Sequence, residues 1–259
     1  MTASGNALVG YTGFVGSNLR GQHPFRHLYN SKNSSEIAGK SFELLVFSGA
    51  QAVKWWANQN PEEDRRRIQA ALAPLETVSA VQTILISTVD VIPPLPGLID
   101  EGADCRAMRS HPYGENRLYI EEFFRTRFSQ TLIVRLPALF GPGLSKNVLF
   151  DLMHDKLLEK INPASSFQYY DLGRLWRDME TALTAGLDLA HLFTEPVSTG
   201  EIIERFFPGK TVGADAGTEA HYDFRTRHDR LFGGRGGYIE DRATVLARMG
   251  AFIHKEMGK

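Results

Sequence analysis

A short apolar strand that leads directly into three regularly spaced glycines most constrains what this chain can fold into. The strand covers residues 7–9, the glycines are Gly10, Gly13 and Gly16, and a helical pattern begins near residue 14. A turn at Gly10 requires a residue that tolerates positive φ, Gly13 lets the backbone approach a ligand, and Gly16 lets the new helix pack tightly on the strand. This strand–turn–helix unit predicts a cradle for the phosphates of a dinucleotide, although glycines at this spacing also occur in ordinary turns.

The composition is that of an ordinary globular protein. The chain has 259 residues, a formal net charge of −1 and one cysteine, Cys105. The near-zero charge provides no field that would attract nucleic acid or an anionic lipid surface, and a lone cysteine excludes an internal disulfide. The segment Met1–Asn6 has no basic stretch before an apolar run, and no apolar run is as long as a membrane span. We therefore expect a cytoplasmic protein with no membrane or nucleic-acid partner.

Strand and helix patterns alternate through the first half of the chain. Apolar runs predict strands at 27–29, 42–47, 83–88 and 131–135, and helical spacing predicts helices from Asn60 and over 113–126. Asn60 would cap its helix, with Pro61 at the first position and acidic residues behind it. Alternation of this kind predicts an α/β fold with a doubly wound parallel sheet. Too few residues separate the second and third strands for a full helix and strand, so one sheet edge is expected to be trimmed.

The alternation becomes less regular in the second half. The patterns predict helices over 148–160 and 175–185 and strands over 167–172 and 189–193. We expect a dinucleotide-binding domain over residues 1–137, completed by 165–198, and a small C-terminal substrate lobe from 138–164 and 199–259. Trp55 and Trp56 are expected in the core.

Residues with catalytic potential follow the strands, because ligands of such sheets bind outside the carboxyl ends of the strands. Thr88 ends one strand, and Tyr113 and Arg117 open the next helix four residues apart, on one face. A unit charge ~5 Å away at an effective dielectric of ~20 is worth roughly 3 kcal/mol, or more than two pKa units. Arg117 is therefore expected to lower the pKa of the Tyr113 phenol towards neutral pH, and Thr88 would bond the substrate oxygen.

These motifs together resemble the short-chain dehydrogenase/reductase superfamily, and more narrowly its extended branch of nucleotide-sugar epimerases and dehydratases. The resemblance covers most of the chain and rests on residues 10–16, 87–91, 113–117 and 135–143. It implies a Rossmann fold that binds NAD or NADP and pairing of subunits through two long helices, that is, a homodimer. It also implies Thr88, Tyr113 and Arg117 as catalytic residues. The implied coenzyme site comprises Gly10, Thr12, Gly13, Phe14, Val15, Gly16, Asn30, Ser31, Lys32, Ser48, Gly49, Ala50 and Pro137.

Three departures from the family pattern bear on the reaction. The family's lysine four residues after the tyrosine is Arg117 here, which keeps the charge and changes the geometry. The Asp-Glu pair that follows the threonine in dehydratases is Val89-Asp90, which argues against complete dehydration. Ala138 replaces an asparagine that contacts substrate in many relatives. Asp90 and Ala138 are nevertheless expected at the substrate.

Other polar groups admit two interpretations. Ser31 and Lys32 favour NADP over NAD, because no acid is present there to hold a ribose diol, but a solvated turn explains them equally well. Arg225 and Arg227 could clamp an anionic substrate or form surface salt bridges, and Lys146 and Asn147 could contact an anion or cap a helix. The triplet Arg65–Arg67 follows three acids and indicates a solvated face. No motif typical of a metal site is present.

Two classes of function remain. One is an NAD(P)-dependent epimerase or reductase that transfers hydride at a hydroxyl or carbonyl carbon of a sugar-like, anionic small molecule. The family resemblance implies a nucleotide-sugar as that molecule. The other is a non-catalytic NAD(P)-binding sensor or scaffold, suggested by Arg117 and Ala138.

Overall fold

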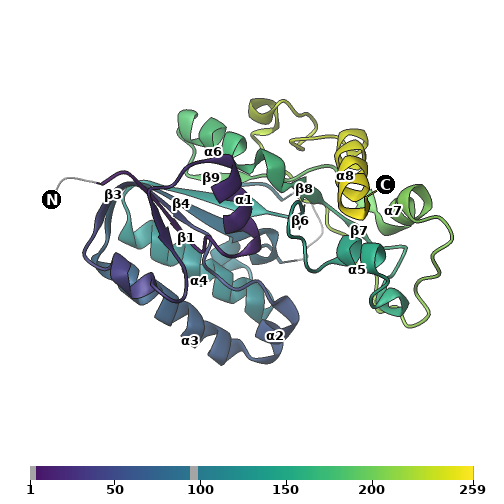
Figure 1. The fold of residues 1–259 in the computed structure, drawn as a ribbon, viewed down its shortest axis with the longest axis horizontal. Coiled ribbons are helices and arrows are strands. Elements are labelled where there is room, and N and C mark those ends of the chain that lie inside the picture. The colour runs from purple at the N-terminus through teal and green to yellow at the C-terminus, as the bar shows by residue number, and fades with distance from the viewer. Residues whose placement is uncertain (1–3, 94–98, 259) are drawn as a thin grey trace. The chain divides into compact units, whose positions relative to one another are not determined.

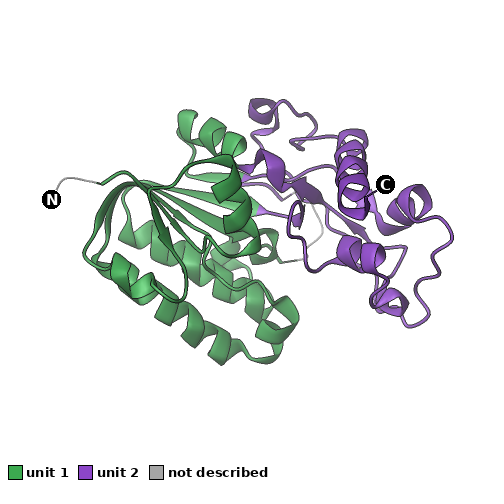
Figure 2. Cartoon of the chain, in the orientation of Figure 1, with its two compact units in different colours: residues 1–96, 102–135, 176–190 green, residues 97–101, 136–175, 191–259 purple. Residues whose placement is uncertain are grey.

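The chain forms two compact units in the computed structural model, which describes residues 4–93 and 99–258. Unit 1 comprises residues 1–96, 102–135 and 176–190, and unit 2 comprises residues 97–101, 136–175 and 191–259 (Figure 2). Both units are therefore assembled from separated chain segments. The division into a coenzyme domain and a substrate lobe assigns functions to parts of the chain and stays a prediction.

Unit 1 is built on a six-stranded sheet with the order β2-β1-β3-β4-β5-β9. The strands are β1 (Asn6–Val9), β2 (His27–Tyr29), β3 (Ser41–Phe47), β4 (Ser79–Thr88), β5 (Thr131–Leu136) and β9 (Leu189–His191). The pairs β1–β2, β1–β3 and β3–β4 are parallel. Only a single 3-10 turn, Ser34–Ile37, separates the edge strand β2 from β3. The predicted parallel α/β sheet with a trimmed edge is confirmed.

Helices cover both faces of this sheet. They are α1 (Phe14–Gln22), α2 (Lys54–Gln59), α3 (Pro61–Leu72), α4 (Pro112–Arg127) and α6 (Leu175–Thr184). Figure 1 shows α3 and α4 together on one face and α1 on the other. On that second face the Trp176 ring of α6 stacks on His23, just after α1, at 3.7 Å between ring centroids. Apolar side chains such as Leu45, Phe47 and Phe124 fill the core between sheet and helices.

The region around α2 differs from the sequence prediction. The helix itself was not predicted, and Trp55 is 66% exposed, so its expected place in the core is wrong. Trp56 lies under the guanidinium of Arg67, 4.3 Å from its ring. Asn60 does not cap α3 with its side chain but donates its amide to the Trp56 carbonyl at 3.0 Å. This contact joins α2 to α3.

Unit 2 contains short strands and three helices. β6 (Ala138–Phe140) pairs in parallel with β8 (Tyr169–Asp171), and β7 (Ser166–Phe167) pairs antiparallel with β10 (Val197–Ser198). The helices are α5 (Val148–His154), α7 (Thr199–Phe206) and α8 (Arg242–Met257). The helix predicted over 148–160 is wrong beyond His154, because Asp155 adopts a left-handed conformation with φ 54°. The strand predicted over 167–172 is interrupted at Gln168.

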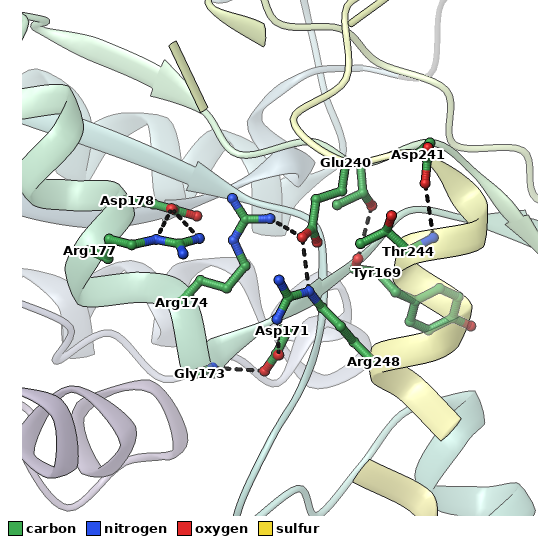
Figure 3. Close-up of polar contacts among 11 residues, drawn as sticks. Tyr169, Asp171, Gly173, Arg174, Arg177, Asp178, Glu240, Asp241, Thr244 and Arg248 are labelled. Atoms are coloured by element: carbon green, nitrogen blue, oxygen red, sulfur yellow. Dashed lines mark hydrogen bonds and ion pairs between the residues drawn. The ribbon is translucent and has the colours of Figure 1, made fainter. Parts of the chain in front are cut away.

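A charged network stabilises the interior of unit 2. Figure 3 shows Arg174 reaching Glu240, while Arg248 lies between Glu240 and Asp171. Arg248 contacts Glu240 at 2.9 Å and Asp171 at 3.6 Å. The Asp171 carboxylate also accepts the Gly173 N–H at 2.8 Å. The Arg174–Glu240 pair is buried and so satisfies two charges that need partners, and the half-exposed Arg248 connects α8 to this pair and to the turn after β8.

Candidate active site

The glycines after β1 have different structural requirements. Gly10 has φ +89°, and a Cβ there would lie 2.7 Å from the Ser48 carbonyl group. A Cβ at Gly16 would lie 2.1 Å from the Gly10 carbonyl oxygen. At Gly13 the nearest atom to a built Cβ is the Gly10 oxygen at 3.4 Å, which is ordinary contact. Packing therefore requires glycine at positions 10 and 16, whereas a Cβ at Gly13 would meet no protein atom closer than 3.4 Å.

The turn fits an anion. Gly13 is the N-cap of α1 and has no side chain to bond the first backbone N–H groups, and the first turn of α1 contains no acid. Thr12 and Gly13 are exposed, and Phe14 and Val15 form the start of the helix. Unbonded amides and the positive end of the helix dipole favour a phosphate at such a position. The predicted cradle residues therefore lie together and suit a pyrophosphate.

The segment after β3 lies beside the cradle. Both the Ser48 N–H and its hydroxyl donate to the Val9 carbonyl, at 2.9 and 3.1 Å. Gly49 packs on the Phe47 ring, where a Cβ would meet the ring edge at 3.2 Å. Ala50 packs against the core of unit 1. These contacts fix the loop next to Gly10, and its role in holding a coenzyme stays a prediction.

The turn after β2 contains the predicted coenzyme-specificity residues. The Asn30 Oδ1 accepts the Lys32 N–H at 2.9 Å, and the Asn30 N–H donates to Asn33 Oδ1 at 2.8 Å. Asn30 and Asn33 therefore shape the turn through their side chains. Ser31 and Lys32 are exposed at its tip. The Ser31 hydroxyl and the Lys32 ammonium group are therefore accessible and could bond the ribose phosphate of NADP.

Thr88 and Tyr113 are linked through Asp90, which lies in the 3-10 turn Val89–Val91 after β4. The Asp90 N–H donates to the Thr88 hydroxyl at 3.2 Å, and the Asp90 carbonyl accepts the Ser110 hydroxyl at 3.1 Å. A Cβ at Gly114 would lie 2.1 Å from the same carbonyl oxygen, so α4 approaches this turn as closely as a backbone can. The structure therefore brings the start of α4, with Tyr113, to the end of β4.

Asp90 is the charged centre of this cluster. Its Oδ1 is 2.6 Å from Lys54 Nζ and 3.5 Å from His111 Nε2, and its Oδ2 is 3.5 Å from the Thr88 hydroxyl. Burial alone would raise the pKa of Asp90, but the hydrogen bond from His111 and the charge of Lys54 outweigh it and hold the pKa below the usual 3.8. Asp90 is thus a carboxylate at neutral pH and not a proton donor. The sequence did not identify Lys54 or His111.

We expect the Asp90 contacts to make stability depend on acid pH. A carboxyl group whose pKa is lower in the folded state stabilises that state above its unfolded pKa, and the contribution is lost as pH falls through the folded pKa. Asp90→Asn should therefore lower the free energy of unfolding by about 1.5–3 kcal/mol at pH 7. Urea unfolding of both proteins should show the difference shrinking as the pH falls below 3.8. A difference that stays constant with pH would contradict this.

Arg117 lowers the pKa of the Tyr113 phenol as expected, but the expected net shift towards neutral pH is wrong, because the pKa is raised. Tyr113 is 5% exposed, and burial raises the pKa of its phenol above 10. Arg117 lies 4.2 Å from the centre of the Tyr113 ring, and its charge lowers the pKa by less than burial raises it. The negative charge of Asp90 raises the pKa further. Burial removes the water that would stabilise a phenolate, and this effect exceeds the attraction of the one cation that the sequence suggests.

Arg117 also forms a buried ion pair with Asp64. Its Nη1 and Nη2 bond the Asp64 carboxylate of α3 at 2.8 and 3.2 Å, and Nη2 also donates to the Gln51 carbonyl. The Asn116 side-chain amide donates to Asp64 at 2.9 Å. The Arg117 and Asp64 side chains are both 5% exposed. Arg117 therefore joins α4 to α3 beneath Tyr113, a role that requires the planar fork of an arginine.

Unit 2 contains the remaining predicted substrate residues. Ala138 is the first residue of β6, and Pro137, a predicted coenzyme residue, directly precedes it. Asn147 caps α5, since its Oδ1 accepts the Phe150 N–H at 3.0 Å, and it donates to the Leu139 carbonyl at 2.9 Å. Helix capping therefore accounts for Asn147. An anion contact of the preceding residue, Lys146, stays a prediction.

The two arginines proposed as a clamp are each paired with an acid. Arg225 bonds Asp223 and lies 3.9 Å from the centre of the Tyr238 ring, and Arg227 bonds Asp100 at 2.7 Å. The salt-bridge interpretation accounts for both contacts. Anion binding by Arg225 and Arg227 stays a prediction.

Neither a membrane span nor a metal-ligand group is found in the described part of the chain. No helix there is both long and apolar enough to cross a bilayer. Three or more His, Cys, Asp or Glu side chains do not gather at any point within residues 4–93 and 99–258 in a way that could hold a metal ion.

Comparison with solved structures identifies the fold. No protein-family model matches the sequence, and no curated protein matches it. The chain resembles RMD from Pseudomonas aeruginosa, solved with NADPH, at a TM-score of 0.71 and 16% identity over 99% of this chain and 100% of that one. It also resembles the dTDP-4-dehydrorhamnose reductase from Bacillus anthracis, solved with NADP. The TM-score is 0.71 and the identity 13%, over 98% of this chain and 99% of that one.

A dehydratase has the same architecture. The dTDP-glucose 4,6-dehydratase DesIV from Streptomyces venezuelae, solved with NAD and TYD, matches at a TM-score of 0.70 and 15% identity over 98% of each chain. Reductases and dehydratases therefore share the arrangement described above over nearly their full lengths. The chain has the fold of the extended short-chain dehydrogenases/reductases, the superfamily that its motifs resemble.

Proposed function

We propose that the protein is an NAD(P)-dependent oxidoreductase or epimerase that transfers hydride at a hydroxyl or carbonyl carbon of a sugar-like, anionic substrate, of the nucleotide-sugar type. The observation that carries the proposal is the glycine turn, where packing requires Gly10 and Gly16 while space remains beside Gly13. That space lies at the uncapped start of α1, where a pyrophosphate is favoured. When bound there, the coenzyme supplies the hydride acceptor or donor.

The proposed roles follow from the position of each side chain. The turn over residues 10–16 and the loop Ser48–Ala50 would hold the coenzyme, with Ser31 and Lys32 favouring the phosphate of NADP. Thr88 would bond the substrate oxygen. Tyr113 would move the proton, and its raised pKa keeps it protonated at neutral pH. It can therefore donate a proton during reduction.

The state of Asp90 favours reduction or epimerisation over dehydration. Loss of a hydroxyl group needs a proton donor, and Asp90 is held as a carboxylate by Lys54 and His111. The solved structures with this fold include both dTDP-4-dehydrorhamnose reductases and dTDP-glucose 4,6-dehydratases, so the preference rests on Asp90 and not on the fold. A reductase should consume added NADPH, whereas an epimerase should retain its coenzyme and turn over without any addition. A fall in NADPH absorbance with the ketone dTDP-4-dehydrorhamnose as probe detects a reductase, and NMR of the sugar after incubation with dTDP-glucose or UDP-glucose, without added coenzyme, detects an epimerase.

A non-catalytic coenzyme sensor is the second candidate. It is favoured by Arg117, whose guanidinium is bound to Asp64, where the catalytic pattern of the superfamily has a lysine. A sensor would bind coenzyme through the same turn and would show no turnover with any of the probes.

Gly13→Val should abolish coenzyme binding without unfolding the protein. The added side chain would fill the proposed pyrophosphate space, while the nearest protein atom to its Cβ lies at 3.4 Å. We expect the Kd for NADPH, measured by fluorescence titration, to rise at least about 100-fold, a loss of about 2.7 kcal/mol. Gly217→Val is the matched control, because Gly217 is a glycine of unit 2 without a left-handed φ, and a Cβ there would meet no atom within 4 Å. Unchanged NADPH affinity in folded Gly13→Val would refute the proposed coenzyme site.

A further inference from the structure

Helix α2 reaches both of the proposed catalytic elements. Lys54 and Asn58 are four residues apart in α2 and so share one face of it. Lys54 Nζ bonds Asp90, whose N–H holds the Thr88 hydroxyl at 3.2 Å. Asn58 Oδ1 accepts the backbone N–H of Tyr113 at 2.9 Å. One turn of helix therefore contacts both the end of β4 and the start of α4.

The placement of α2 depends on these polar contacts. The helix has six residues, and Ala57 is its buried residue. A helix this short is unstable alone and takes its position from tertiary contacts. The Lys54 and Asn58 contacts connect it to the two segments on which Thr88 and Tyr113 lie. The relative position of Thr88 and Tyr113 thus depends on the position of α2.

Accessibility distinguishes Lys54 from Arg117 as the functional cation. The Arg117 side chain is 5% exposed and bound to Asp64, so it cannot meet a ligand without breaking a buried ion pair. The Lys54 side chain is 39% exposed, and its partner Asp90 is 15% exposed. Lys54 is therefore the more accessible of the two cations, and it is bound to Asp90 beside Thr88.

We propose that Lys54 and Asn58 are positioning residues, which hold Thr88 and Tyr113 in the relative geometry that hydride transfer needs. This inference rests on the proposed function. A misplacement of about 1 Å can cost a factor of about 10² in rate, so small shifts of either element should be visible in turnover.

Lys54→Met and Asn58→Leu test the proposal. We expect each to lower kcat by about 10- to 100-fold and to leave the Kd for NADPH unchanged. Lys54→Arg, which keeps the charge, and Asn58→Asp, which keeps the acceptor, should recover most of the rate. Gln59→Ala, an exposed position on the same helix, is the matched control and should behave as wild type. Wild-type kcat in both Lys54→Met and Asn58→Leu would overturn the proposal.

A second readout is independent of turnover. The charged groups around Tyr113 are Arg117 on α4, Asp90 after β4 and Lys54 on α2, and the His111 ring lies 6.1 Å away. Lys54→Met should raise the pKa of Tyr113 and Asp90→Asn should lower it, which ¹³C NMR of labelled tyrosine can follow with Tyr113→Phe as the assignment. If no probe is turned over, the proposed function fails separately. Unshifted amide NMR signals of Thr88 and Tyr113 in both Lys54→Met and Asn58→Leu would still overturn the positioning role.

Discussion

Replacing Tyr113 with phenylalanine is expected to lower turnover by a factor of about 10²–10⁴ while coenzyme affinity stays unchanged. The substitution removes one hydroxyl group and keeps the ring that packs on the Arg117 guanidinium at 4.2 Å. The N–H that bonds Asn58 belongs to the backbone and is retained. The fold should therefore persist, and the loss should report the proton transfer alone. Steady-state rates and an NADPH titration on the same preparation measure both quantities.

Tyr119→Phe is the matched control. Tyr119 lies on the same helix, partly buried against the core and next to the Arg65 guanidinium, so its hydroxyl group has no part in the proposed chemistry. Full turnover in Tyr113→Phe would exclude the phenol as the proton donor. If wild type binds coenzyme and neither protein turns over any probe, the sensor is the better description.

Breaking the buried Arg135–Glu121 pair should cause the largest loss of stability. Arg135 of β5 bonds Glu121 of α4 through Nε at 2.9 Å and Nη2 at 2.7 Å, and Ser87 of β4 donates to the same carboxylate at 2.6 Å. Glu121 is completely buried. Arg135→Leu leaves that carboxylate without its cation, so we expect the free energy of unfolding to fall by about 3–5 kcal/mol.

Urea unfolding measures this loss. Arg106→Ala removes a similar pair with Asp104 on the surface and should leave the unfolding midpoint nearly unchanged. The double variant Arg135→Leu/Glu121→Leu should recover part of the stability, because it leaves no unpaired buried charge. A loss in Arg135→Leu no larger than that in Arg106→Ala would show that the pair does not stabilise the fold.

The fold could be predicted because its strands are apolar runs separated by turn-forming residues. The residues 27–29, 42–47, 83–88 and 131–135 all lie within observed strands, and within the six-stranded sheet the longest stretch that was not predicted is the four residues that extend β4 before Thr83. Those four alternate between exposed and partly buried positions, so they lack the apolar signal of a central strand. Helix α2 was missed because six residues are too few to show a helical period.

The partners of the site residues could not be predicted, because they depend on contacts between distant segments. Asp64 is separated from Arg117 by 53 residues and Lys54 from Asp90 by 36. The ion pair of Arg117 with Asp64 depends on such a contact and has no signal in the sequence. The same holds for the burial of Tyr113, which raises the pKa of its phenol. The glycine turn is different, since its requirements are local to residues 10–16 and could be predicted from their spacing.

The most direct test of the central claim is an NMR titration of the ¹⁵N-labelled protein with NADPH and NADH. We predict shifts centred on the amides of residues 10–16 and 48–50, extending to residues 30–32 with NADPH, and absent in Gly13→Val. Amides that stay unshifted at saturating concentrations of both coenzymes, or shifts confined to residues remote from the glycine turn, would contradict the account.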